Sequence, residues 1–321
     1  MGRSVIGMLS AYRDITQSDW LWQQTPEPFG GWRNIQMLKN APQPDFLLLY
    51  QFDFYRKVSS PKPWFNPLQQ RQIQNEKIIL TDAELKGVPP ERTIYLMREP
   101  PLVETLDRIQ LNYQEAQTYC GYISGPDDLA PIPGYMPAIW YHSNSFQELD
   151  QMPIPAKVRP CSWITSGISR TENHRKRLAF LQQLQTKSLL IDFYGRNLPA
   201  TVISQGELQN KWYAMAPYHY NLAIENFADN QWYVSEKLWD SLLAWCLPIY
   251  YGGSAADRLL PPGSFLRLPS LDEKGIAYIQ EVIATPDAWH AAQDAIAEAR
   301  QIILHKLNLL NWLSEFVDRH S

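Results

Sequence analysis

The stretch at residues 220–253 reads YNLAIENFADNQWYVSEKLWDSLLAWCLPIYYGG and carries the clearest fold signal in the sequence. Its apolar start predicts a buried strand over 220–224, and its end, LPIYYGG, predicts a second strand. Between them we expect a loop and then a helix over about 236–245. Parallel strands are usually joined through a helix, so this stretch predicts a βαβ unit in an open α/β sheet.

Strand and helix patterns also alternate on both sides of this unit. The region before it predicts a strand at CSWITSG (161–167), a helix over 172–185 and a strand over 189–194. In the first half of the chain, apolar runs predict strands over 3–11, 45–54, 77–80 and 93–97. The run DFLLLYQFDF at 45–54 is almost continuously apolar, which is typical of a parallel strand buried on both faces. We therefore expect doubly wound α/β architecture.

A proline-rich segment divides the chain. QMPIPAKVRP at 151–160 holds three prolines and scattered charges that interrupt any regular pattern. We expect two domains, 1–155 and 156–321, which suits a chain of 321 residues because domains of about 150 residues are common. The tail at 288–317 has apolar residues three or four positions apart, which predicts an amphipathic helix. This helix either docks on the core or offers a surface to a membrane or a partner.

Charge and cysteine content limit the classes of function. The 29 Lys and Arg against 33 Asp and Glu give a net charge of −4, which argues against nucleic acid as a partner but leaves room for a local basic pocket. The three cysteines show no Cys-x-x-Cys spacing, so we expect neither a disulfide framework nor a zinc site, and a cytoplasmic location fits best. No window approaches about 18 uninterrupted apolar residues, so we expect no transmembrane segment.

Several common catalytic signatures do not occur. The sequence has no G-x-G-x-x-G after a predicted strand and no G-x-x-x-x-G-K-[ST], which weighs against dehydrogenases and P-loop nucleotidases. It also has no H-E-x-x-H, no G-x-S-x-G and no Asp-x-Asp pair. The six histidines are dispersed along the chain. We therefore expect no metal site and no required cofactor.

The residues best placed for chemistry lie in the stretch 220–253. Glu225 and Asn226 fall where a strand ends, the position at which open α/β sheets bind ligands. Ser235 is suited to be an N-cap, which places Glu236 and Lys237 in the first helical turn. A lysine is unfavourable there, but a bound phosphate would offset its charge. The alternative is a capped helix with two solvated charges.

This stretch resembles the signature of the alpha-1,3-fucosyltransferases, glycosyltransferase family 10. The family motif is Y-x-F-x-L-x-F-E-N, a loop, Y-[VIT]-[ST]-E-K-[LIV], a helix and a V/I-P-[VI]-x-x-G strand. The matching positions here are Tyr218, Tyr220, Leu222, Ile224, Glu225, Asn226, Tyr233, Ser235, Glu236, Lys237, Leu238, Pro248 and Gly252. LLIDFYGR at 189–196 is similar to the family's V-D-x-[YF]-G-[RK] strand. The first 150 residues match weakly.

The helix before LLIDFYGR resembles the family helix that carries a phosphate-binding arginine. Arg177 is the best match, and Arg175 is the alternative. Some positions depart from the family: His219 stands where many members have Lys, and Trp245 and Cys246 replace small residues. The membrane stem and paired cysteines of anchored members have no counterpart, so the likeness is to soluble bacterial members.

The resemblance implies a fold, a reaction and a partner for each half of the chain. The fold is two facing Rossmann-like domains of the GT-B type around a cleft, with a C-terminal amphipathic helix. The reaction is inverting transfer of L-fucose from GDP-β-L-fucose, held by the second domain, to a hydroxyl of an oligosaccharide or glycoconjugate, held by the first. The remaining alternatives are a transferase for another nucleotide sugar, such as GDP-mannose, and a non-catalytic carbohydrate-binding protein on the same fold.

The resemblance also implies roles for the donor-binding residues. Arg177 and Lys237 would neutralise the diphosphate, and Glu236 would bind the ribose hydroxyls. The phosphate and the fucose would be contacted by Asn226 and Tyr233. A developing oxocarbenium ion would be stabilised by Glu225.

The catalytic base of the family follows a strand in the first domain. TIYLMREPP at 93–101 ends a predicted strand, which makes Glu99 the candidate; the alternative is an exposed glutamate paired to its neighbour. We expect Glu99 to lie partly buried among aromatic side chains, which raises the pKa of a carboxyl group. Aromatic residues in the first-half loops are expected to stack on acceptor sugars: Trp20, Trp22, Phe29, Trp32, Trp64 and Phe65. In the second half we expect Trp239 in the core.

Overall fold

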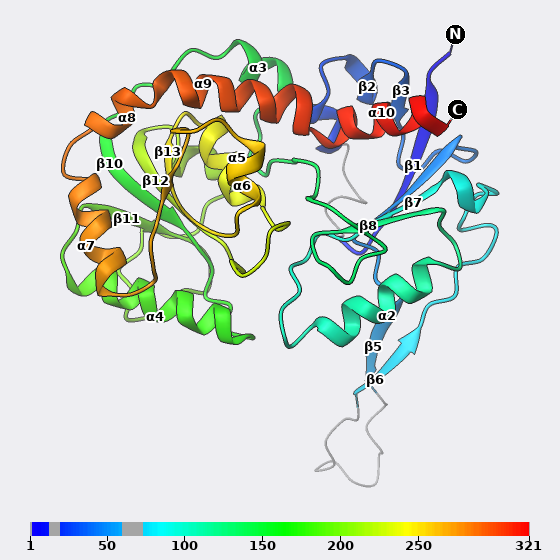
Figure 1. Cartoon of the computed structure of the whole chain (residues 1–321), viewed down its shortest axis with the longest axis horizontal. Helices are drawn as coiled ribbons and strands as arrows, with labels where there is room; N and C mark the ends of the chain where they lie inside the picture. The colour runs from blue at the N-terminus through cyan, green and yellow to red at the C-terminus, as the bar shows by residue number, and fades with distance from the viewer. Residues whose placement is uncertain (1, 13–19, 60–72, 321) are drawn as a thin grey trace, which may run out of the picture.

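The computed structural model describes residues 2–12, 20–59 and 73–320. They form two large sheets that lie side by side, each with helices packed on it, and a small two-stranded sheet (Figure 1). The first sheet has the strand order β2-β3-β1-β4-β7-β8-β9, and every neighbouring pair in it is parallel except β2 and β3. Its strands are β1 (Ser4–Ser10), β2 (Gly31–Trp32), β3 (Ile35–Met37), β4 (Phe46–Tyr50), β7 (Thr93–Leu96), β8 (Tyr122–Gly125) and β9 (Ile132–Pro133).

The second sheet is parallel throughout, in the order β11-β10-β12-β13-β14. Its strands are β10 (Arg159–Ile164), β11 (Ile191–Tyr194), β12 (Tyr218–Ile224), β13 (Leu247–Tyr251) and β14 (Leu266–Arg267). The helices of this half are α4 (Glu172–Thr186), α5 (Glu236–Leu243), α6 (Ala255–Leu259), α7 (Glu273–Val282), α8 (Asp287–Ala291) and α9 (Gln293–Gln301). The expected βαβ unit is confirmed as β12, α5 and β13, and the α/β fold class is confirmed with it.

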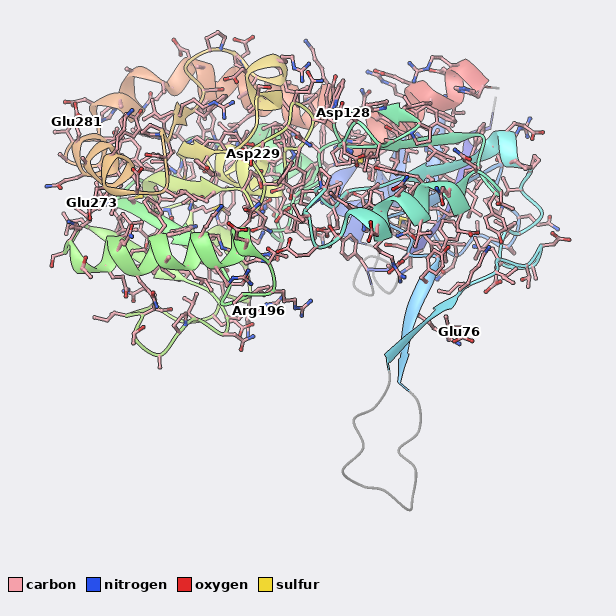
Figure 2. All side chains as sticks on the ribbon, turned by 60° about the horizontal axis from the view of Figure 1, so that its bottom comes forward. Glu76, Asp128, Arg196, Asp229, Glu273 and Glu281 are labelled. Carbon is pink, nitrogen blue, oxygen red and sulfur yellow. The ribbon has the colours of Figure 1, made fainter. Side chains whose placement is uncertain are left out.

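The strand expected over 77–80 is wrong. Instead, β6 (Ile73–Lys77) pairs with β5 (Tyr55–Ser59) as an antiparallel hairpin. This hairpin projects from the body of the molecule, with Glu76 on it (Figures 1 and 2). Because β5 and β6 pair with each other in antiparallel fashion, they form a separate two-stranded sheet and do not extend the parallel one.

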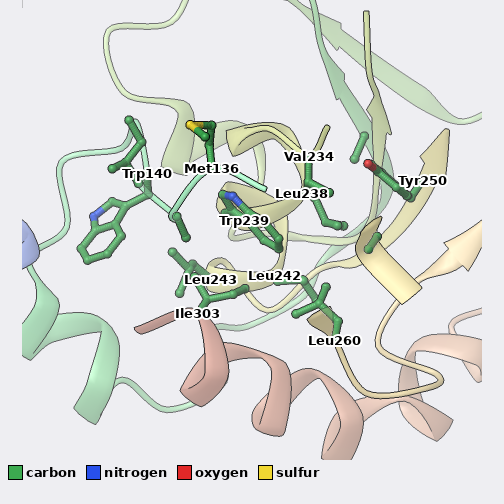
Figure 3. Close-up of a cluster of buried hydrophobic side chains, with 14 of the residues drawn as sticks. Met136, Trp140, Val234, Leu238, Trp239, Leu242, Leu243, Tyr250, Leu260 and Ile303 are labelled. Atoms are coloured by element: carbon green, nitrogen blue, oxygen red, sulfur yellow. The ribbon is translucent and has the colours of Figure 1, made fainter. Parts of the chain in front are cut away.

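Helix α5 is fixed by a core that extends through both halves of the molecule. Its apolar face, Leu238, Trp239, Leu242 and Leu243, is buried, so the expected core position of Trp239 is confirmed. Figure 3 shows these side chains beside Met136 and Trp140 from the connecting segment (residues 134–158, between β9 and β10) and Ile303 from the tail. Burying each such side chain stabilises the fold by about 1.5–3 kcal/mol.

The tail docks on the core, as one of the two alternatives proposed, but it is not a single helix. After α9 comes a π-helical turn (Ile302–Leu307), and the backbone is extended at Asn308 before α10 (Leu309–His320) begins. The buried Asn308 side chain donates to the Gln24 carbonyl at 2.9 Å and accepts from the N–H of Leu310 at 2.8 Å. These bonds hold the break.

The last helix returns to the first sheet (Figure 1). On α10, Phe316 packs edge-on against Phe46 of β4 at 6.3 Å between ring centres, and against Tyr122 of β8. The division into 1–155 and 156–321 remains a proposal, and α10 belongs by packing with the first part. Two further helices, α2 (Leu106–Ala116) and α3 (Phe146–Gln151), complete the described helices longer than one turn. None of the described helices combines the length and the apolar character needed to cross a membrane.

Candidate active site

A cleft of about 610 Å³ opens between the two sheets. Its walls come from the residues that follow β7, β10, β11 and β12, together with the first turns of α5. These are the carboxyl ends of parallel strands, where open α/β sheets bind ligands. From the first half the lining residues include Tyr12, Arg98, Glu99 and Tyr141.

A glycine turn shapes one wall of the cleft. Gly195 follows β11 with φ of 145°, in the region that favours glycine, and an added Cβ would lie 1.6 Å from the Thr165 carbonyl oxygen. Only glycine lets the chain after β11 approach the chain after β10 this closely. Arg196, labelled in Figure 2, follows this glycine and also lines the cleft.

The start of helix α5 is organised by a buried carboxylate. Ser235 caps the helix as the sequence predicts, and its Oγ accepts from the N–H of Lys237. Glu225 accepts from the Ser235 N–H at 2.8 Å and from Ser235 Oγ at 2.6 Å. The side chain of Glu225 has no exposed surface. Glu225 therefore ties the end of β12 to the start of α5.

Lys237 lies on the cleft side of this arrangement. Its Nζ donates to Glu225 Oε2 at 3.1 Å and to Ser235 Oγ at 2.9 Å. Burial works to lower the pKa of Lys237, but Glu225 and Glu236 outweigh burial and raise it. The ammonium group carries three donors, of which these contacts use two, so one remains for a ligand in the cleft.

Arg177 is a buried cation on α4 with only neutral partners. Its side chain donates to Asn226 Oδ1 at 2.5 Å and to the Ser166 carbonyl at 3.0 Å, while its Nε has no partner among the described atoms. Burial lowers the pKa of the Arg177 guanidinium to about 10. A buried charge without a counter-ion is costly, which makes Arg177 receptive to an anion.

Glu236 lies between cations from three parts of the chain. Its carboxylate is 3.8 Å from Arg98 and 3.8 Å from Lys211, which lies in the 3₁₀ turn Lys211–Ala214. Burial works to raise the pKa of Glu236, but the neighbouring cations outweigh it and lower the pKa to about 2; they are Lys237, Lys211 and Arg98. Glu236 is therefore a fixed anion at the edge of the cleft, able to accept hydrogen bonds from hydroxyl groups.

Glu99 follows β7 and faces the cleft from the first half. Its carboxylate accepts a hydrogen bond from the Tyr12 hydroxyl, and its backbone N–H donates to Gln51 Oε1 at 3.1 Å. The expectation that Glu99 is partly buried is wrong: the residue is exposed, because it follows the strand end in the open mouth of the cleft. An exposed carboxylate at this point is accessible to a hydroxyl group of a second substrate.

The structure gathers most of the predicted site residues into one cleft: Glu99, Arg177, Asn226, Tyr233, Glu236 and Lys237. Glu225 lies beneath the cleft surface with both carboxylate oxygens bonded, so the expected contact with an oxocarbenium ion is replaced by a role in positioning α5. Arg175 is exposed, and its guanidinium donates to the Ser169 carbonyl outside the cleft lining. This geometry favours Arg177 over Arg175.

Sequence reasoning missed Arg98 and Lys211, which complete the charge arrangement of the cleft. Arg98 directly precedes Glu99, and its position after a predicted strand was a usable signal. No local pattern marks Lys211, whose Nζ donates to Asp240 Oδ2 at 3.0 Å. Asp240 also accepts from the Tyr141 N–H at 2.9 Å, so the second half holds the connecting segment at the cleft.

Three of the aromatic residues expected to stack on sugars, Trp22, Phe29 and Trp32, do not line this cleft. Trp32 is buried against Phe146, and the Trp22 indole donates to the Met37 carbonyl at 2.8 Å while packing edge-on against Phe29. Trp32 is buried and Phe29 is 68% exposed, and none of the three residues lines this cleft, so their expected sugar-stacking role stays a prediction. Trp64, Phe65 and the side chain of Trp20 lie outside the described residues.

Within residues 2–12, 20–59 and 73–320, no group of three or more His, Cys, Asp or Glu side chains is arranged to hold a metal ion. Five basic side chains line the cleft: Arg98, Arg177, Arg196, Lys211 and Lys237.

Known proteins resemble this chain most specifically in its second half. Residues 154–289 match the family model described as "Glycosyltransferase family 10 (fucosyltransferase) C-term". Alpha-(1,3)-fucosyltransferase C of Drosophila melanogaster is 31% identical over 137 residues, 41% of this chain and 30% of the fly protein. Alpha-(1,4)-fucosyltransferase of Arabidopsis thaliana is 34% identical over 95 residues, 27% of this chain and 23% of the plant protein. The chain thus matches less than a third of the length of either curated relative.

Solved structures resemble the whole chain. An alpha-glucosyltransferase (AGT) in complex with UDP matches with a TM-score of 0.53 at 9% identity, covering 99% of this chain and 99% of that chain. A crystal structure of an alpha1,3-fucosyltransferase matches with a TM-score of 0.47 at 15% identity, covering 95% of this chain and 91% of that chain. The first likeness agrees with the two-sheet, GT-B type fold.

Proposed function

We propose that this protein is a glycosyltransferase of family 10 that transfers L-fucose from GDP-β-L-fucose to a hydroxyl of a glycan, with inversion at the anomeric carbon. The match of residues 154–289 to the family model supports this proposal. The observation that carries the proposal is Arg177, a buried cation that faces the cleft with only neutral partners. Its position beside the N-terminus of α5 suits a diphosphate, since backbone N–H groups and the helix dipole favour an anion there.

The donor binds against the second sheet. Arg177 and Lys237 neutralise the diphosphate, and Asn226, already bonded to Arg177, orients it. The carboxylate of Glu236 accepts hydrogen bonds from the ribose hydroxyls. As the bond from fucose to phosphate breaks, negative charge grows on GDP, and fixed cations in a partly closed cleft stabilise that charge without rearrangement.

The acceptor binds against the first half, where Glu99 acts as general base. Its carboxylate takes the proton of the acceptor hydroxyl while the oxygen of that hydroxyl attacks the anomeric carbon of fucose. The bond to the β-phosphate breaks on the opposite face, and GDP leaves. General base catalysis of this kind contributes about 10²- to 10⁴-fold in rate.

This reaction needs no metal ion if side chains neutralise the diphosphate, and that is part of the proposal. A reducing compartment is also proposed, because Cys120, Cys161 and Cys246 are all free thiols, buried within the fold. We also propose a glycan as the acceptor. The first-half side of the cleft holds few charged groups besides Arg98 and Glu99, which suits a neutral sugar.

The test compares nucleotides on the purified protein. Isothermal titration with GDP, UDP, GDP-fucose and GDP-mannose should give the tightest binding for the two ligands GDP and GDP-fucose, with UDP much weaker. Tight binding of GDP-mannose with turnover would point instead to another nucleotide sugar. Binding without hydrolysis or transfer from any donor would point to the carbohydrate-binding alternative, and no binding of a guanine nucleotide would contradict both transferase proposals.

A further inference from the structure

Arg98 is a buried cation that the proposed reaction does not yet use. Its side chain is 8% exposed, and its guanidinium lies over the rings of Tyr50 and Tyr141 at 5.6 and 5.8 Å. Its Nη1 donates to the Tyr141 hydroxyl at 3.1 Å. Holding a long charged side chain in so closed a site restricts its rotamers, so the structure fixes where this charge lies.

The backbone at Arg98 is held by one side-chain amide. Gln51 follows β4, and its Oε1 accepts from the N–H of Arg98 at 2.6 Å and from the N–H of Glu99 at 3.1 Å. The N–H of Gln51 in turn donates to the Leu96 carbonyl at 2.7 Å. The ends of β4 and β7 are thereby joined, and Arg98 and Glu99 are fixed as a pair.

The Arg98 guanidinium reaches from this pair to the other half of the molecule. Its Nη2 lies 3.8 Å from Glu236 Oε2, in the first turn of α5. The other oxygen of Glu236 faces Lys211 at 3.8 Å, and Lys211 is held by Asp240 at 3.0 Å. Glu236 therefore has a cation on each side, one from each half. Both distances exceed that of a hydrogen bond, so the oxygens keep acceptor capacity for a ligand.

We infer that Arg98 is a positioning residue that couples the donor site to the catalytic base. Its guanidinium keeps the Glu236 carboxylate oriented toward the bound donor and at a fixed position relative to Glu99. The inference rests on the proposed function, in which Glu236 binds ribose and Glu99 takes the acceptor proton. Without Arg98, the remaining cations Lys211 and Lys237 both pull Glu236 toward the second half. The carboxylate then turns from the cleft, and the donor loses its alignment with Glu99.

The test is a double-substitution cycle with Arg98→Gln and Glu236→Gln, read by GDP affinity and by kcat and KM for GDP-fucose. Because neighbouring charges in one network couple by up to about 100-fold, Arg98→Gln should weaken GDP binding and reduce kcat/KM by about 10-fold or more. In the Glu236→Gln background the same substitution should change GDP affinity less than about threefold. Arg98→Lys, which keeps the charge, should recover part of kcat.

Arg108→Gln is the matched control. Arg108 also carries a carboxylate partner, Asp53 at 2.9 Å, and lies over the Tyr55 ring at 4.8 Å, but it does not line the cleft. Its replacement should alter thermal stability and leave GDP affinity unchanged. If Arg98→Gln does not fold, Arg98→Lys is used in the same cycle, because it keeps a cation over the two tyrosine rings.

The outcomes separate this inference from the function on which it rests. If the wild-type protein transfers fucose and Arg98→Gln has the same GDP affinity, kcat and KM, the inference is overturned and the proposed function stands. A loss of GDP affinity that is equally large in the Glu236→Gln background also overturns the inference, since Arg98 would then act without Glu236. If the wild-type protein binds no guanine nucleotide, the proposed function fails and the inference fails with it.

Discussion

Arg177 donates a 2.5 Å hydrogen bond to Oδ1 of Asn226, and among the described residues no acidic side chain pairs with it. Burying an arginine whose partners are all neutral is unfavourable, because its charge has no counter-ion. The two residues come from the helix before β11 and from the end of β12, so they meet only in the folded chain. Their contact marks the place where we expect the donor diphosphate.

Replacing Arg177 should separate binding from stability. Arg177→Met should weaken GDP binding by about 1.5–3 kcal/mol, since it removes a charge-assisted contact, while the melting temperature stays equal or rises because an unpaired buried charge is lost. Titration calorimetry and thermal denaturation measure the two effects. Arg175→Met, on the exposed side of the same helix, is the control and should change neither. A similar loss of affinity in both variants would argue against Arg177 as the phosphate ligand.

Replacing Glu99 should stop transfer and spare donor binding. Glu99→Gln removes the group that accepts the acceptor proton, so kcat should fall by about 10²- to 10⁴-fold while the Kd for GDP changes little. Initial-rate assays and titration on the same preparation measure both. Glu91→Gln, an exposed glutamate before the same strand, serves as the control. A parallel loss of GDP affinity would show that Glu99 belongs to the donor site instead.

Replacing Lys237 should affect both binding and folding, because its ammonium group is bonded to the buried carboxylate of Glu225. Lys237→Met should weaken GDP binding by about 1.5–3 kcal/mol and should also destabilise the fold by leaving Glu225 without its cation. Adding Glu225→Gln should restore much of the stability and none of the GDP affinity. Chemical denaturation and calorimetry distinguish the two. Recovery of affinity in the double variant would place the diphosphate elsewhere.

Ionised Glu236 should make the stability of the folded protein depend on pH in the acid range. Neighbouring cations lower the pKa of Glu236 from 4.5 to about 2, so the folded state favours its charged form. A lowered carboxyl pKa stabilises the fold fully above the unfolded value, and that contribution is lost as the pH falls from about 4.5 to about 2. In denaturant titrations, wild type should therefore lose more stability than Glu236→Gln over this range. Equal losses would mean that the cations do not hold Glu236 ionised.

The elements around the donor site were predictable because their signals are local. The apolar run of β12, the helix expected after it and the N-cap Ser235 lie within one stretch of sequence, and each is confirmed in place. The break at Asn308 was not predictable, because apolar residues continue at helical spacing through it. The bond that holds the break reaches Gln24, 284 positions away in the chain.

Contacts between single residues of the candidate site were also not predictable from local sequence. Glu225 and Lys237 were both recognised as site residues, but the sequence does not reveal that one is buried beneath the cleft and bonded to the other. Arg98 and Glu236 are separated by more than a hundred positions and meet across the cleft. Contacts of this kind depend on how two sheets pack together, which no local pattern encodes.

The most direct measurement of the central claim is fucosyl transfer itself. Purified protein is incubated with GDP-fucose and a panel of oligosaccharide acceptors, and GDP release and fucosylated products are followed by mass spectrometry, with Glu99→Gln and Arg177→Met in parallel. We expect GDP release with a product heavier by one fucose for at least one acceptor, strongly reduced in both variants. No GDP release with any acceptor, together with no binding of GDP, would contradict this expectation.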